Sequence, residues 1–142
     1  MREVPKELWG EVLEVVTAIT WGPDGGEPDP NVSETALARL RAIYARQEGL
    51  GHPEPFLTEA LADYTDDASE AVALYRRALA QSTGYPDEPT HTKRICMASR
   101  LIELGDLAGA RSELVLGRDE AERLSDRDYV EMADELLEKV GV

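Results

Sequence analysis

A dense cluster of carboxyl groups lies near one turn of the chain, at Asp63, Asp66 and Asp67. Two carboxyl groups that share a pocket can serve as a general acid and a general base. Aspartates near a turn also cap helices and remain solvated on a surface. We favour the second interpretation, because the sequence shows no basic or metal-binding partner beside the cluster. The cluster therefore predicts no catalytic residue.

Histidine and cysteine, the other residue types with versatile chemistry, are sparse. His52 and His91 lie in expected linkers and fit neither an HExxH pattern nor another close spacing of zinc ligands. We expect His91, near the start of a helix, to be a surface residue. The only cysteine, Cys96, lies in an apolar helical run, and we interpret it as a small buried hydrophobe. It lacks the electropositive setting that activates a thiol.

Metal-binding and phosphate-binding patterns give no positive signal. Asp24, Glu27 and Asp29 suggest calcium by residue type, but the alternating Asp/Asn spacing of an EF-hand loop is absent. The sequence contains no P-loop, no dinucleotide-binding glycine pattern and no nucleophile elbow. It therefore predicts no metal, no cofactor and no enzymatic activity.

The composition describes one globular domain with a strong acidic excess. Of 142 residues, 42% are apolar and 31% are charged, and this balance favours a folded domain over disorder. With 15 basic and 29 acidic residues, the formal net charge is −14. Nucleic acids and anionic membranes attract basic surfaces, so neither is expected as a partner. The charge fits a basic protein partner, although solubility alone also explains it.

The sequence predicts neither secretion nor membrane insertion. Glu7, Glu11 and Glu14 interrupt the stretch that would have to be the apolar region of a signal peptide. No run approaches the roughly 18 apolar residues that cross a bilayer. Cys96 has no second cysteine with which to form an intrachain disulfide. We therefore expect the protein in a reducing cytoplasm.

The elements that position these residues are predicted to be helices throughout. Apolar side chains recur at helical spacing, and Gly- and Pro-rich segments separate the runs. The expected helices cover about 5–19, 34–47, 54–64, 67–81, 91–104, 107–124 and 126–140. The fold class is thus all-α, in a single domain over 1–142. The helix at 126–140 has one apolar and one acidic face, and we expect it to cap the end of the stack.

Residue types at the helix ends predict how several helices begin. Aspartate and hydroxyl side chains accept hydrogen bonds from the free N–H groups of a first helical turn. The predicted caps are Ser33, Asp67, Thr90, Asp106 and Ser125. Capping-box spacing supports the caps at positions 67 and 125. Gly109 and Gly117 fall inside one helix, and we attribute both to the close approach of a neighbouring helix.

Two connections, 20–33 and 82–89, are rich in proline and glycine. Trp21, in the first, either packs on the core or serves as a binding anchor, and we favour the core. Tyr85, in the second, is expected to be exposed. Because aromatic side chains carry much of the binding energy at interfaces, both are candidates for contacts with a protein partner.

Residues 102–117 contain a helical hairpin around which the chain is organised. Gly105 can end one helix with a positive φ, and Asp106 can cap the next. The same residue types recur 39 positions apart. The matched pairs are Asp67 and Asp106, Ala71 and Ala110, Tyr75 and Leu114, and Ala78 and Gly117. A repeated helical hairpin is typical of a solenoid.

These residues resemble the tetratricopeptide repeat, a helix pair of about 34 residues. Ala71, Tyr75 and Ala78 match its small–aromatic–small pattern, and Ala98 and Leu101 match the small–bulky pair of the preceding helix. The resemblance covers about 54–124. It implies a short tetratricopeptide-like (TPR-like) solenoid or bundle of antiparallel helical hairpins.

Members of this family usually bind peptides or proteins in a groove lined by the first helix of each pair. By the resemblance, the groove-facing residues of the fifth helix are Thr92, Ile95, Ser99, Ile102 and Glu103. The Lys and Asn residues with which the family clamps C-terminal carboxylates are missing there. The resemblance therefore implies a protein-binding groove but not a chaperone-tail adaptor.

The sequence favours a non-enzymatic module that binds a protein or peptide partner. The patch expected to face a basic partner contains Asp63, Asp66, Asp67 and Glu70. A narrower alternative is an immunity protein or antitoxin that neutralises a basic toxin, such as a nuclease, by resembling its anionic substrate. A small-molecule-binding bundle or an enzyme is the third alternative, and it requires a pocket with convergent polar groups.

Overall fold

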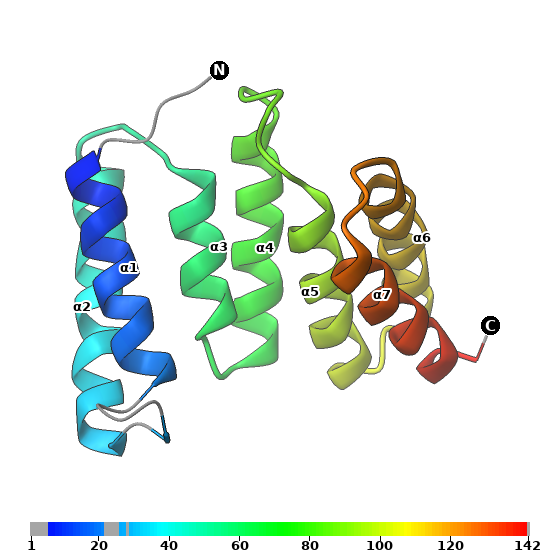
Figure 1. The fold of residues 1–142 in the computed structure, drawn as a ribbon, viewed down its shortest axis with the longest axis horizontal. Helices are drawn as coiled ribbons and strands as arrows, with labels where there is room; N and C mark the ends of the chain where they lie inside the picture. Colours follow the sequence, from blue (N-terminus) through cyan, green and yellow to red (C-terminus); the bar gives the residue numbers. More distant parts are fainter. Residues whose placement is uncertain (1–5, 22–25, 28, 142) are drawn as a thin grey trace.

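The chain is built from α-helices, as the computed structural model shows for residues 6–21, 26–27 and 29–141 (Figure 1). Within these residues there are seven helices and no strand. They are α1 (Lys6–Thr20), α2 (Pro30–Gly49), α3 (Pro55–Asp63), α4 (Ala68–Ser82), α5 (His91–Glu103), α6 (Leu107–Arg123) and α7 (Arg127–Lys139). The predicted all-α class is confirmed. Position 5, where we expected the first helix to begin, lies outside the described residues.

Consecutive helices pack against one another and form a row of hairpins (Figure 1). α1 pairs with α2, α3 with α4, and α5 with α6, while α7 lies against both α5 and α6 at one end of the row. Contacts between α2 and α3 and between α4 and α5 join one hairpin to the next. The result is a helical bundle or short solenoid, in which each hairpin depends on its neighbours.

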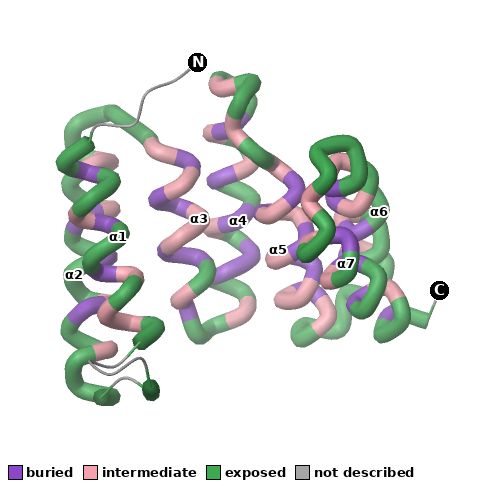
Figure 2. The backbone as a smooth tube through the Cα atoms, viewed as in Figure 1, coloured by how far each residue is buried: buried purple, intermediate pink, exposed green. Residues whose placement is uncertain are grey.

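The core consists of two clusters of buried apolar side chains. Figure 2 marks the buried residues along the row of helices. One cluster joins α1, α2 and α3 and includes Leu40 and Leu57, and the other joins α3 to α7 and includes Ile95 and Leu114. Leu74 of α4 packs against both clusters. Each fully buried leucine contributes about 1.5–3 kcal/mol relative to an exposed one. Packing between neighbouring hairpins therefore holds the row together.

The turns that follow α5 and α6 have the same backbone arrangement. In the first, Gly105 has a φ of +82°, and the N–H groups at 105 and 106 bond back to α5. In the second, Ser125 has a φ of +58°, and the N–H groups at 125 and 126 bond back to α6 in the same pattern. Such a left-handed residue closes a helix C-terminus. The prediction for Gly105 is confirmed, whereas the prediction that Ser125 caps α7 is wrong, because Ser125 closes α6.

Two aspartates cap helices as predicted. Asp67 Oδ1 accepts a hydrogen bond from Glu70 N at 3.0 Å at the start of α4. Asp106 Oδ1 accepts one from Gly109 N at 2.9 Å at the start of α6. Each carboxylate satisfies an N–H group that has no partner within its helix.

The two glycines inside α6 have different reasons to be there. A Cβ at Gly117 would stand 2.7 Å from Ile95 Cγ1, so the predicted close approach of α5 and α6 is confirmed at this position. A Cβ at Gly109 would instead stand 2.5 Å from the carboxylate of Asp106. The prediction for Gly109 is therefore wrong, because that glycine leaves room for the cap and not for a neighbouring helix.

α2 begins at Pro30 and not at position 34, where the sequence predicts its start. Asp29 is the cap, and its Oδ1 accepts a hydrogen bond from Asn31 N at 2.8 Å. Pro30 fits the first turn, where its missing N–H is not needed. Ser33 is not a cap, because it lies inside the helix and its Oγ donates to Ile19 O at 3.5 Å.

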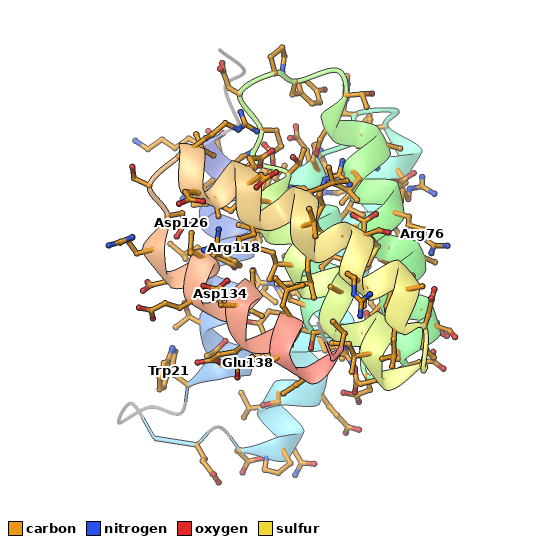
Figure 3. All side chains as sticks on the ribbon, turned by 90° about the vertical axis from the view of Figure 1, so that its right-hand side faces the viewer. Trp21, Arg76, Arg118, Asp126, Asp134 and Glu138 are labelled. Atoms are coloured by element: carbon orange, nitrogen blue, oxygen red, sulfur yellow. The ribbon has the colours of Figure 1, made fainter. Side chains whose placement is uncertain are left out.

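α7 shows the two faces that its sequence predicts. Val130, Ala133 and Leu136 are buried. The acidic residues of the opposite face are exposed, and they are Asp128, Glu131, Glu135 and Glu138. Figure 3 shows Glu138 on the surface of α7. In the described part of the chain, every helix is too short or too polar to cross a membrane.

Candidate functional site

α1 and α3 lie side by side and run in the same direction in the N-terminal half of the row (Figure 1). At one end, the ring centroids of Trp9 and Phe56 are 5.4 Å apart, with an interplanar angle of 52°. At the other end, Thr20 Oγ1 and Tyr64 OH form a hydrogen bond of 2.7 Å. The N-terminal half of α1 therefore lies against the N-terminal half of α3, and the C-terminal ends of the two helices lie against each other as well. We call the strip between them the α1–α3 seam.

An apolar groove of about 200 Å³ occupies the Trp9 end of the seam. It is lined by Trp9, Val12, Leu13, Val16, Phe56 and Ala60. The exposed fractions of Trp9 and Leu13 are 52% and 53%. These two residues lie one turn apart on α1, beside the stripe that packs on α2, so the core does not need them. Large apolar side chains that line an open groove are typical of a binding surface.

An acidic hollow of about 280 Å³ lies at the other end of the seam. It is lined by Ile19, Ser33, Glu34, Leu37, Asp63, Tyr64 and Asp66. Three of these described residues are acids, and none is Lys or Arg. Ile19 is three residues beyond Val16 on α1, and Asp63 is three residues beyond Ala60 on α3, so the hollow follows the groove after one helical turn.

Asp63 lines the acidic hollow and also forms a hydrogen bond with a buried core residue. Its Oδ1 accepts a hydrogen bond from Tyr75 OH of α4 at 2.5 Å. Although much of the residue is exposed, protein atoms crowd its carboxyl group, and this burial raises its pKa to about 6. The Tyr75 hydrogen bond opposes the rise in pKa, and the nearby negative charge of Glu59 adds to it. Asp63 therefore keeps a partly desolvated negative charge at neutral pH.

The four acids predicted to face a basic partner separate into two pairs. Asp63 and Asp66 both line the hollow. Asp67 and Glu70 belong to the first turn of α4, where the Asp67 carboxylate is engaged as a helix cap. The interpretation of the cluster as solvated caps thus holds for Asp67 but not for Asp63, whose carboxylate bonds to Tyr75.

The residues of α5 that the resemblance assigns to a groove do not form one exposed surface. Ile95 is fully buried against Gly117, so it cannot contact a partner, and this part of the prediction is wrong. Thr92, Ser99 and Ile102 are partly buried. Glu103 is exposed and pairs with Arg100, with Oε2 and Nη1 3.1 Å apart.

The two aromatic candidates lie in different connections. Trp21 is 57% exposed at the end of α1, so the expectation that it packs on the core is wrong (Figure 3). Tyr85, in the connection between α4 and α5, is partly buried and not exposed as predicted. These connections lie at opposite ends of the helices in Figure 1, and the structure does not bring the two rings together.

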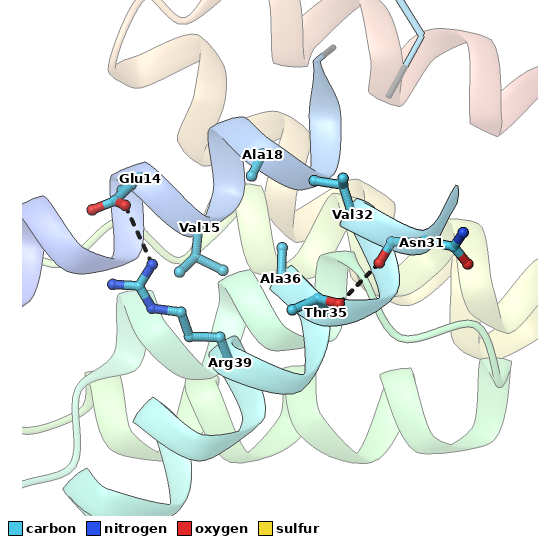
Figure 4. Close-up of a pocket in the computed structure, with 8 residues that line it drawn as sticks. All are labelled: Glu14, Val15, Ala18, Asn31, Val32, Thr35, Ala36 and Arg39. Atoms are coloured by element: carbon cyan, nitrogen blue, oxygen red, sulfur yellow. Dashed lines mark hydrogen bonds and ion pairs between the residues drawn. The ribbon is translucent and has the colours of Figure 1, made fainter. Parts of the chain in front are cut away.

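A third hollow, of about 370 Å³, has its described lining on α1 and α2 (Figure 4). Its lining residues are Glu14, Val15, Ala18, Asn31, Val32, Thr35, Ala36 and Arg39. Small side chains leave space between the two helices, and an ion pair between Glu14 and Arg39, 3.3 Å from Oε1 to Nη1, lies at its rim. The acid and the base here pair with each other, whereas the described lining of the acidic hollow contains no Lys or Arg.

A fully buried lysine, which the sequence analysis missed, ties the α4–α5 connection to α3. Lys93 Nζ donates hydrogen bonds to Glu59 Oε1 at 2.9 Å, Glu88 Oε1 at 3.1 Å and Pro89 O at 2.7 Å. A buried ammonium group needs such partners, because desolvation of an unpaired charge is costly. We interpret this group as a structural tie.

His91 is buried, so its predicted surface position is wrong. Its Nδ1 is 3.0 Å from Glu120 Oε2 and its Nε2 is 2.8 Å from Asp126 Oδ2, which links α5, α6 and the start of α7. Glu120 also accepts hydrogen bonds from the backbone N–H groups of Thr90 and His91. Thr90 occupies the N-cap position of α5 as predicted, but its side chain does not cap the helix, because a carboxylate from α6 accepts the N–H hydrogen bonds instead.

Cys96 lies among groups that make its thiol unreactive. The residue is partly buried, and burial raises the pKa of the thiol to about 12. The negative charge of Asp63 acts in the same direction. Because the thiolate is the nucleophilic form, this thiol stays protonated at neutral pH. The interpretation of Cys96 as a small core residue agrees with these surroundings.

Neither a metal-ligand cluster in the described residues nor a similar known protein points to a second site. In the parts of the chain that the structure describes, no three His, Cys, Asp or Glu side chains are grouped so as to hold a metal ion. Asp24, one of the residues considered for calcium, lies outside those parts. No protein-family model, curated protein or solved structure matches the chain. The α1–α3 seam, argued from its own geometry, is the candidate site.

Proposed function

We propose that the protein is a non-enzymatic module that binds a protein partner at the α1–α3 seam. The observation that carries this proposal is the apolar groove with Trp9 and Leu13 each about half exposed. Burial of such side chains by a partner is favourable by about 25 cal/mol per Å² of apolar surface removed from water. Exposed tryptophan is also a side chain that commonly dominates the binding energy of an interface.

The hairpin architecture supports the same proposal. A row of packed helices holds α1 and α3 in fixed relative positions, so a groove between them needs little ordering when a partner binds. We propose further that α3 to α6 are two TPR-like units and that the protein acts in the cytoplasm. The seam lies between the first helices of the α1–α2 and α3–α4 hairpins, which is where a TPR-like groove would run.

Quantitative affinity capture tests the proposal. We expect the immobilised wild-type protein to retain a stoichiometric protein from its native extract, and a Trp9→Ala/Leu13→Ser variant to lose it. Leu50→Ser is the matched control, because Leu50 is 60% exposed at the end of α2 and does not line the seam. Equal capture by the wild type and the seam variant, with both folded by circular dichroism, would show that the seam is not the binding site.

A second candidate function is neutralisation of a basic protein, such as a toxin nuclease, by the acidic face of α7. Asp128, Glu131, Glu135 and Glu138 are exposed and spaced to lie along one face of the helix. The same capture separates the two functions. Neutralisation predicts that a Glu131→Gln/Glu135→Gln/Glu138→Gln variant loses the partner, and that binding to the wild type weakens steeply with salt.

A further inference from the structure

Two hollows of opposite character adjoin along one seam. The apolar groove extends from Trp9 to Val16 on α1, and the acidic hollow begins at Ile19. A helix rises 1.5 Å per residue, so the hollow at Ile19 lies about 9 Å from Leu13 and about 15 Å from Trp9 along the axis of α1. One ligand segment can therefore reach both hollows.

We propose that the α1–α3 seam recognises an extended partner segment in which a large apolar side chain is followed or preceded by Lys or Arg. The apolar side chain enters the groove beside Trp9 and Leu13. The cation enters the hollow formed by Glu34, Asp63 and Asp66. This inference rests on the proposed function, and it defines the partner by the order and spacing of two side chains.

The spacing of the two side chains follows from the helix geometry. An extended chain advances about 3.3 Å per residue, so a separation of about 9–15 Å corresponds to about three to five residues. An amphipathic helix lays a continuous apolar stripe into a groove, whereas here an acidic hollow follows the apolar groove after one helical turn. Two separate side chains on an extended backbone therefore fit better than the continuous stripe of an amphipathic helix.

Charge complementarity selects a cation for the acidic hollow. Its described lining carries three carboxylates and no Lys or Arg, and the nearest cations, Lys93 and Arg100, act on Asp63 from outside that lining and are bonded elsewhere. Tyr75 holds Asp63 in place through Oδ1, so this carboxylate does not have to be ordered by the ligand. A guanidinium or ammonium group that enters the hollow would form charge-assisted hydrogen bonds, which are roughly twice as strong as neutral ones.

Selection from a phage-displayed library of random peptides tests the inference. On the wild-type protein, we expect enriched peptides to carry Leu, Phe or Trp and a Lys or Arg about three to five residues away. On a Glu34→Gln/Asp63→Asn/Asp66→Asn variant, the cation should disappear from the enriched peptides while the apolar residue remains. Glu131→Gln/Glu135→Gln/Glu138→Gln is the matched control, because it removes the same formal charge from α7, away from the seam.

The best peptide is then synthesised, and its affinity is measured by fluorescence anisotropy. We expect the triple seam variant to weaken binding about tenfold to a hundredfold and the α7 variant to change it less than about twofold. Equal losses in both variants would overturn the inference, since they would show a general charge effect. Enriched peptides without a cation would overturn it as well, while leaving the groove as a binding site.

Failure of the inference is distinguishable from failure of the proposed function. If the Trp9→Ala/Leu13→Ser variant enriches the same peptides as the wild type, the seam is not a binding site and both proposals fail. If that variant abolishes enrichment but the acidic variant does not alter the selected peptides, only the two-part recognition fails. Circular dichroism of each variant confirms that loss of binding does not come from loss of fold.

Discussion

At the scale of single residues, Asp63 lies in the candidate site, and its desolvated charge lowers the stability of the fold at neutral pH. Its carboxyl group has a pKa of about 6, against an ordinary value of 3.8, because protein atoms crowd it. Removal of water from this charge opposes folding at neutral pH, and in the proposed site it would favour a cationic ligand. Such a conflict between local stability and placement is what a functional residue is expected to show.

The sign of the pH effect follows from the raised pKa. Between about pH 4 and pH 6 the folded state binds more protons at Asp63 than the unfolded state does, so the contribution of Asp63 to the free energy of unfolding falls as the pH rises. Asp63→Asn removes this titration and keeps an oxygen that can accept the Tyr75 hydrogen bond. We expect the variant to be more stable than the wild type at pH 7 and to lose this advantage below pH 4.

Urea unfolding, followed by circular dichroism from pH 3.5 to pH 8, measures this difference. Asp66→Asn is the control, because it removes the same charge from the same hollow and leaves the Asp63–Tyr75 hydrogen bond in place. A variant at position 63 that is less stable than the wild type at pH 7 would contradict the desolvation argument. Higher stability combined with weaker binding of the selected peptide would identify Asp63 as a residue that serves binding at the expense of stability.

At the scale of the elements, the turns after α5 and α6 show how a single residue determines the free-energy cost of a left-handed backbone conformation. Gly105 and Ser125 occupy the same left-handed position, but only glycine adopts that backbone without a steric penalty. We expect Ser125→Gly to raise the free energy of unfolding by roughly 0.5–1 kcal/mol, since the relief of about 1–2 kcal/mol exceeds the added entropy of the unfolded chain. Chemical denaturation at neutral pH measures the change.

The reciprocal substitution provides the control for this turn. Gly105→Ser places in the first turn the residue that the second turn carries, so it should lower stability by a similar amount. If Ser125→Gly were neutral or destabilising, the Ser125 side chain would have to contribute an interaction that offsets the strain. The two variants together separate the backbone effect from any side-chain effect.

The element scale also shows what the sequence could and could not predict. Regular apolar spacing identified all seven helices of the described residues, and Asp67 and Asp106 identified two caps, because these signals are local. The start of α2 was misplaced because Pro30 reads as a helix breaker, although a first turn accepts proline. His91 lies four residues before Ile95, on the same buried stripe, so helical spacing alone contained the signal that it is inside.

The seam could not be predicted in the same way. Trp9 belongs to α1 and Phe56 to α3, and nothing in either helix alone shows that the two rings meet. The predicted acids Asp63 and Asp66 line one hollow, but that hollow also includes Glu34 from α2. A site formed by three helices depends on how the hairpins stack, and stacking is a property of the whole fold.

At the scale of the whole molecule, the candidate site lies at the end of the row that has the fewest neighbours. The α1–α2 hairpin packs mainly on α3, with Leu74 and Arg77 of α4 also reaching it, whereas α5 contacts α4, α6 and α7. Stability is therefore expected to vary along the row, with α1 and α2 opening more readily than α5 and α6. We expect hydrogen exchange, measured by mass spectrometry, to show slower exchange in α5 and α6 than in α1 and α2.

Ligand binding across the seam should remove much of that difference. A segment that contacts both α1 and α3 binds only when the first hairpin is docked, so at a free concentration 100 times its Kd it opposes opening by about 2.7 kcal/mol. With the selected peptide present, exchange should slow most in α1, α2 and α3, and in α6 only for amides that exchange through global unfolding. Uniform slowing over the whole chain would show stabilisation against global unfolding alone, and protection confined to α7 would move the binding site to the acidic face.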